Sequence, residues 1–133
     1  MNRQDSLGKY TLISTLLASF LTPFMGSAIN LAIPDIGVDF NTGAALLSWI
    51  VTCYLLTTAA LLLPFGRLAD IVGRKKVFAA GLAVFSVASL LCATAWSIQS
   101  LIVFRVVQGV GGAMIFGTAI AILTSVFPPQ ERG

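Results

Sequence analysis

The 133-residue chain contains no histidine, few charged residues and only two cysteines. Without histidine, it cannot form a Ser-His-Asp triad, a His-ligated metal site or an imidazole pH switch of its own. Cys53 and Cys92 lie in apolar runs without CxxC spacing, so they predict neither a disulfide framework nor a zinc site. We therefore expect no metal, no cofactor and no enzymatic activity.

Charged residues make up 10% of the chain, whereas a soluble domain has about 25%. Hydrophobic residues make up 57%, and the mean hydropathy is +0.95. A bilayer core about 30 Å thick needs about 20 apolar helical residues. Strands, at about 3–10 residues, are too short for such runs. The sequence therefore predicts an all-α integral membrane protein with four transmembrane helices, at residues 10–33, 46–65, 77–96 and 101–127.

The net charge of +3 lies mostly in the short segments between these runs. A nucleic-acid-binding protein would carry its basic residues as a stripe on a water-facing surface, so we expect no nucleic-acid partner. Seven Lys and Arg residues precede the first run, follow the fourth or join the second to the third. The connections 34–45 and 97–100 contain none. Because Lys and Arg stay on the cytoplasmic side, we expect a multi-pass plasma-membrane protein, contacting lipid, with both termini and the connection 66–76 in the cytoplasm.

The connection 66–76 combines Gly66 and Gly73 with Asp70, a single acid among four basic residues. The two glycines permit tight turns. The carboxylate can accept charge-assisted hydrogen bonds from a neighbouring Arg or a helix N-terminus. The pattern predicts a short ordered turn. The alternative is a solvated loop that only sets topology.

Small residues recur every fourth position in the last run, at Gly109, Ala113, Gly117 and Ala121, and Gly112 widens this surface. Such a ridge allows another membrane helix to approach closely. We therefore expect a helix-packing face here.

Arg105 is the only charged residue within the four runs, and Gln108 shares its predicted face. An Arg at mid-membrane costs at least about 2.5 kcal/mol and is by default a candidate functional residue. The alternative is that its long side chain reaches the outer interface. Asn30, near the end of the first run, either lines a cavity or bonds between helices.

Several of these segments resemble parts of the major facilitator superfamily. Residues 66–76 resemble its signature loop between helices two and three, with Gly66, Leu68, Asp70, Gly73 and the paired bases Arg74 and Lys75 in the family's order. Residues 105–113 resemble the fourth-helix motif of the drug:proton antiporters, and residues 127–133 resemble the segment immediately after that helix. Residues 30–34 resemble the end of the first helix in the fourteen-helix branch.

The resemblance implies an efflux transporter for small molecules that works by alternating access. It implies that Asp70 and the basic residues near it in the segment 66–76 lock the cytoplasmic side and that Arg105 takes part in ion or substrate handling. Gln108 and Asn30 are further candidates for the cavity or coupling site. It also implies a fragment whose partners are the remaining helices of a larger bundle. The alternatives are a self-contained four-helix exporter or a non-transporting adaptor.

One position departs from the branch pattern. The branch usually places an aspartate five positions before the first-helix asparagine, and this chain has Met25 there. The four runs therefore contain no acid, so proton coupling cannot use a carboxylate within them.

Overall fold

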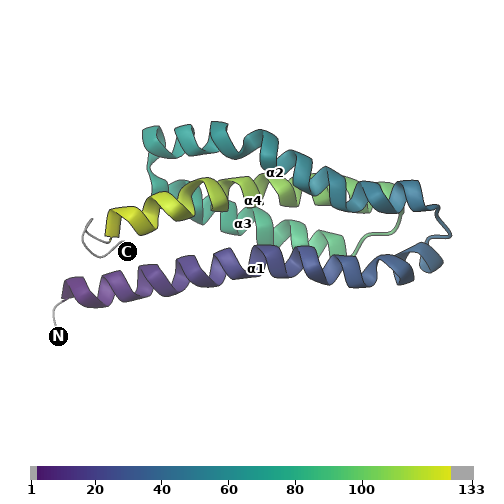
Figure 1. The fold of residues 1–133 in the computed structure, drawn as a ribbon, viewed down its shortest axis with the longest axis horizontal. Helices are drawn as coiled ribbons and strands as arrows, with labels where there is room; N and C mark the ends of the chain where they lie inside the picture. The colour runs from purple at the N-terminus through teal and green to yellow at the C-terminus, as the bar shows by residue number, and fades with distance from the viewer. Residues whose placement is uncertain (1–2, 127–133) are drawn as a thin grey trace.

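The computed structural model describes residues 3–126, which form four antiparallel helices. These are α1 (Arg3–Asp39), α2 (Ala44–Val72), α3 (Arg74–Ala93) and α4 (Ile98–Val126). Each contains a segment long and apolar enough to cross a membrane. The predicted all-α fold with four membrane-spanning helices is confirmed. Both ends of the described chain lie at the same end of the bundle (Figure 1). Residues 127–133, for which the sequence predicts the segment after the fourth helix, lie outside the described part.

The sequence predicts a connection over residues 66–76, but the connection in the structure is much shorter. Residues 66–72 form about two further turns of α2, and α3 begins at Arg74, so Gly73 is the whole connection. The segment 67–72 contains three good helix formers, Arg67, Leu68 and Ala69, and no Gly or Pro, so the helix can continue beyond the apolar run. The connection after α1 is likewise shorter than expected, because α1 continues through Pro34 to Asp39.

Gly73 makes this abrupt connection possible. Its φ angle is +117°, a region that side chains with a Cβ rarely enter. Its N–H donates to the carbonyl oxygen of Ala69 at 3.0 Å, which closes the last turn of α2. The next residue, Arg74, already belongs to α3. A single glycine thus reverses the chain and fixes Asp70 and Arg74 one turn apart.

Helix α4 lies at the centre of the bundle, packed mainly against α2 and α3, while α1 contacts the others less (Figure 1). The small residues of α4 face two neighbours. A Cβ on Gly109 would lie 2.9 Å from the Tyr54 carbonyl oxygen of α2, and one on Gly117 would lie 3.1 Å from that of Leu62. A Cβ on Gly111 would lie 2.6 Å from the Phe85 nitrogen of α3. The ridge therefore finds its partner in α2, within these four helices.

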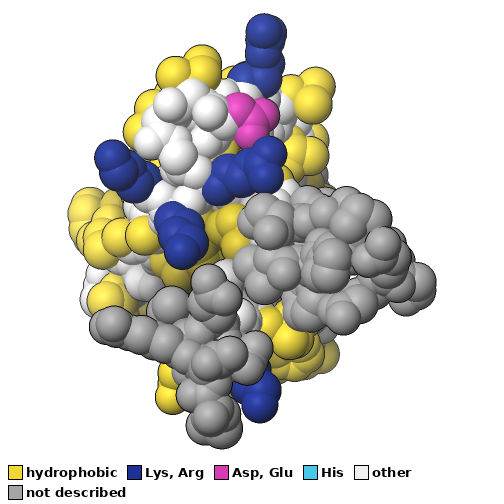
Figure 2. Space-filling view, turned by 90° about the vertical axis from the view of Figure 1, so that its left-hand side faces the viewer, with side chains coloured by type: hydrophobic (Ala, Val, Ile, Leu, Met, Phe, Trp, Pro, Cys, Tyr) yellow, Lys and Arg dark blue, Asp and Glu magenta, His cyan; other side chains and the backbone are white. Residues whose placement is uncertain are grey.

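The outer surface has the two regions expected of a membrane bundle. Large apolar side chains are exposed along its length, such as Phe20, Leu31 and Leu63. So much apolar surface marks contact with lipid or further protein. At the end shown in Figure 2, where α2 meets α3, basic side chains gather around one acid.

The α3–α4 contact yields a stability prediction. Gly111→Ala should lower the stability of the bundle by about 1–3 kcal/mol, because the new methyl group meets the α3 backbone, which cannot move aside cheaply. Gly26→Ala is the matched control, since a Cβ there has nothing within 4 Å. Thermal unfolding in detergent measures both variants. Equal midpoints for the two variants would contradict the close approach of α3 and α4.

Candidate functional site

Arg105 lies about two turns into α4 and is 1% exposed, the largest of the fully buried side chains. Its Nε donates to the backbone carbonyl oxygen of Ile50 on α2 at 3.2 Å. Its Nη1 donates to Oε1 of Gln108, three residues along the same helix. The guanidinium is thus held inside the bundle, and the shared face expected from the sequence appears as a direct hydrogen bond.

Two further side chains complete what we call the Arg105 network: Arg105, Gln108, Ser89, Tyr54 and the Ile50 carbonyl. Nε2 of Gln108 donates to Oγ of Ser89 on α3 at 2.7 Å. The guanidinium carbon lies 4.4 Å from the ring centroid of Tyr54 on α2, a cation–π distance. The network therefore joins α2, α3 and α4 at one level of the bundle.

The Arg105 network leaves two polar atoms without partners. Within the described part of the chain, Nη2 of Arg105 and the Tyr54 hydroxyl are the buried side-chain polar atoms that make no hydrogen bond. Among these residues, no carboxylate forms an ion pair with the guanidinium. A buried charge without a counter-ion is costly, and an unsatisfied donor adds to that cost. Such atoms in a native protein call for a ligand, water or further protein.

Two cavities border Arg105. The first, of about 390 Å³, is lined by residues that include Met25, Asp39, Ser89 and Gln108. Met25 occupies the position where the antiporter branch usually has an aspartate. An acid there would border the same cavity as Arg105.

The second cavity, of about 320 Å³, lies between α1, α2 and α4. Asn30 lines it from α1 and has no hydrogen bond to the guanidinium. The structure thus joins Arg105 and Gln108 directly and places Asn30 in the lining of a cavity that Arg105 also lines. The complete lining is Thr22, Pro23, Gly26, Asn30, Val51, Tyr54, Leu55, Arg105 and Phe116.

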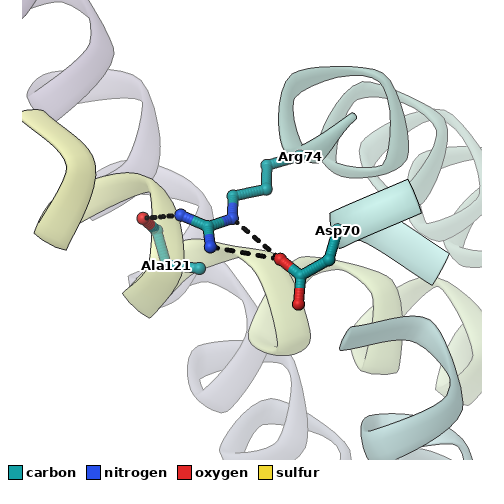
Figure 3. Close-up of polar contacts among 3 residues, drawn as sticks. All are labelled: Asp70, Arg74 and Ala121. Carbon is teal, nitrogen blue, oxygen red and sulfur yellow. Dashed lines mark hydrogen bonds and ion pairs between the residues drawn. The ribbon is translucent and has the colours of Figure 1, made fainter. Parts of the chain in front are cut away.

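A second polar cluster lies at the α2–α3 end. Nε and Nη2 of Arg74 each lie 3.1 Å from the same oxygen of Asp70, and Nη1 donates to the Ala121 carbonyl oxygen of α4 at 3.0 Å (Figure 3). Arg74 therefore ties the start of α3 to the end of α2 and to α4. Both charged side chains are largely exposed, at 41% and 62%, so water screens their attraction.

The other residues predicted for this segment have separate surroundings. Gly66 lies against Gly117 of α4, so it serves helix packing. Leu68 and Lys75 are exposed. Lys75 borders a third cavity, of about 250 Å³, with Tyr10 and Ser14 of α1. Gly112, in the packing face, meets the Tyr54 side chain, and Ala113 is fully buried.

Sequence reasoning missed Tyr54, Ser89 and the Ile50 carbonyl. A tyrosine and a serine inside apolar runs carry a weak signal, because a serine there often bonds only to its own helix and a tyrosine often only packs. Ser89 does bond to its own helix here, donating to the Phe85 carbonyl oxygen at 2.7 Å. No sequence feature reports a backbone carbonyl as a partner. Over residues 3–126, the structure shows no group of three or more metal-binding side chains.

Comparison with known proteins places these features in a family. The profile of the Major Facilitator Superfamily matches residues 15–133. The chain is 34% identical over 122 residues to the riboflavin transporter RibZ of Clostridioides difficile, covering 92% of this chain and 27% of RibZ. It is 34% identical over 134 residues to the multidrug transporter protein MdtP of Bacillus subtilis, covering 99% and 25%. It is 43% identical over 129 residues to the cephamycin export protein CmcT of Amycolatopsis lactamdurans, covering 97% and 26%. The chain thus spans about a quarter of the length of these relatives.

Because the Asp70–Arg74 ion pair is exposed, we expect its two side chains to stabilise each other only weakly. A double-mutant cycle with Asp70→Asn and Arg74→Gln should return a coupling below about 1 kcal/mol, because solvent screens the pair. Arg74→Gln alone should cost more than Asp70→Asn alone, since only Arg74 also bonds to α4. Thermal unfolding in detergent supplies the four stabilities. A coupling above about 2 kcal/mol, or equal single-mutant costs, would contradict this assignment.

Proposed function

The chain belongs to the Major Facilitator Superfamily, and from that premise we propose that its four helices form part of a secondary transporter that exports small molecules by alternating access. The observation that carries the proposal is the Arg105 network, a buried and incompletely paired guanidinium between two cavities. Membrane proteins keep such a costly charge mainly where it handles a substrate or an ion.

The name of one relative supports export. It describes a cephamycin export protein, whereas the names of the other two describe transporters of riboflavin and of multiple drugs without a direction. The residues resembling the drug:proton antiporter motif include two members of the network, Arg105 and Gln108. The substrate of this chain is then a small organic molecule that reaches Arg105 through one of the two cavities.

The Asp70–Arg74–Ala121 cluster, which we call the latch, has the properties of a contact that closes one end of the bundle in one state and opens in another. Its bonds cross from α2 and α3 to α4, yet the charged pair is exposed enough to break at small cost. A contact that forms in one state and opens in another must have this modest strength. We assign it the role of holding that end closed when the other end is open.

Ion coupling has to use groups other than carboxylates of these spans. The acids among the described residues, Asp5, Asp35, Asp39 and Asp70, lie toward helix ends, and Met25 stands at the usual acidic position. If the transporter is an antiporter, Arg105 responds to a proton carried elsewhere in the protein.

We propose that the end bearing the latch faces the cytoplasm, because the basic residues lie at that end. Single cysteines at Asp39→Cys and Lys76→Cys test this, since both positions are exposed and lie at opposite ends. An impermeant maleimide should label Asp39→Cys in intact cells and Lys76→Cys only after permeabilisation. The reverse pattern would overturn the orientation.

Transport by the complete transporter that carries these helices should depend on the shape of Arg105, not its charge alone. Arg105→Lys should lower transport at least about tenfold at equal membrane expression, because an ammonium cannot reproduce the Ile50 and Gln108 bonds together with the cation–π contact to Tyr54. Efflux from cells, normalised to surface protein, measures it. Lys9→Arg, at an exposed position outside both cavities and outside the segment 66–76, is the control and should transport normally. Near-normal transport by Arg105→Lys would show that the buried geometry is unimportant.

A further inference from the structure

The polar residues that line the cavity of about 320 Å³ between α1, α2 and α4 include several hydrogen-bond donors. The residues that line it include Arg105, Tyr54 and Asn30, which have polar side chains. All three can donate hydrogen bonds. No acidic residue is among the described residues that line it. The cavity on the other side of Arg105, by contrast, includes Asp39.

Two of these side chains carry the atoms that lack partners, Nη2 of Arg105 and the Tyr54 hydroxyl. They belong to side chains in contact with each other, since the guanidinium carbon lies 4.4 Å from the Tyr54 ring centroid. A carboxylate matches donors of this kind, because hydrogen bonds from a guanidinium nitrogen to a carboxylate oxygen are charge-assisted and strong. The same anion would also neutralise the buried charge.

The remainder of the lining is mostly apolar and includes Pro23, Val51, Leu55 and Phe116. A volume of about 320 Å³ lies at the lower end of the usual range for small-molecule sites. The cavity is thus lined both by side chains that can donate hydrogen bonds and by apolar side chains. This arrangement suits a molecule with one carboxylate on a compact apolar or aromatic body.

We propose that this cavity is a binding site for organic carboxylates, in which the ligand supplies the counter-ion that the four helices lack. The inference rests on the proposed function and narrows it, by naming the substrate class as compact aromatic or apolar acids. Met25 is part of the argument: an acid at that position would border the other cavity beside Arg105 and compete with the ligand for the guanidinium.

Binding of 2-naphthoate and of the neutral 2-naphthalenemethanol to the complete transporter in nanodiscs tests the proposal by isothermal titration. The acid should bind at least about tenfold more tightly than the alcohol, because only the acid brings a charge to the guanidinium. Arg105→Gln should abolish this difference, and Lys9→Gln, which removes an exposed positive charge outside the cavity, should preserve it. An equal affinity for acid and alcohol, including no binding of either, would overturn the proposal.

Two variants keep the test decisive if Arg105→Gln fails to fold. Tyr54→Phe keeps the ring beneath the guanidinium and removes a hydroxyl that has no partner, so the fold should survive while naphthoate binds about fivefold more weakly. Met25→Asp should also weaken naphthoate binding, because it supplies an internal carboxylate, whereas the uncharged Met25→Asn should not. Unchanged acid binding in both Tyr54→Phe and Met25→Asp would refute the site.

Transport of the same probes in proteoliposomes separates this proposal from the broader one. If naphthoate binds selectively but is never moved, the site stands and the transporter proposal fails. If acid and alcohol are moved equally well, the transporter proposal stands and the carboxylate site fails.

Discussion

A guanidinium cannot remain inside a bundle of apolar helices unless most of its donors and its charge are satisfied. Arg105 meets part of that requirement from three helices: the Ile50 carbonyl and the Tyr54 ring on α2, Gln108 on α4, and Ser89 of α3 through Gln108. These contacts fix the relative height of α2, α3 and α4. Nη2 makes no hydrogen bond within the described part of the chain, and the proposed function of Arg105 depends on this unpaired donor.

Close helix packing makes that arrangement possible. Gly109 and Gly112 bring α4 onto α2 beside Tyr54, and Gly111 brings it onto α3 beside Phe85. With larger side chains, the helices would stand further apart, and Arg105 could not reach the Ile50 carbonyl while Gln108 reached Ser89. The glycines and the polar network are therefore one structural unit, in which small residues supply the proximity that the hydrogen bonds need.

Sequence patterns predicted the four helices well, because length and hydropathy are recorded in the chain itself. They placed Arg105 and Gln108 on one face by helical spacing. They were wrong about the connection 66–76, because hydropathy marks the edge of the apolar run whereas helices end where backbone conformation changes, here at Gly73. They could not supply Ile50, Ser89 or Tyr54 as partners, since contacts between helices depend on rotation and height. The absence of an acid from the spans was readable from the sequence, but its consequence, an unpaired buried donor, required the structure.

The central claim is that Arg105 keeps an uncompensated positive charge beside the cavity lined by Val51 and Tyr54. A cysteine at Val51→Cys, with Cys53 and Cys92 replaced by alanine, reports that charge through its reaction with methanethiosulfonate reagents. The ratio of the rate with the anionic sulfonate reagent to the rate with the cationic ammonium reagent should fall about tenfold when Arg105→Gln is added, because the guanidinium concentrates anions in the cavity. An unchanged ratio would mean that the charge is already neutralised within the protein and would contradict this account.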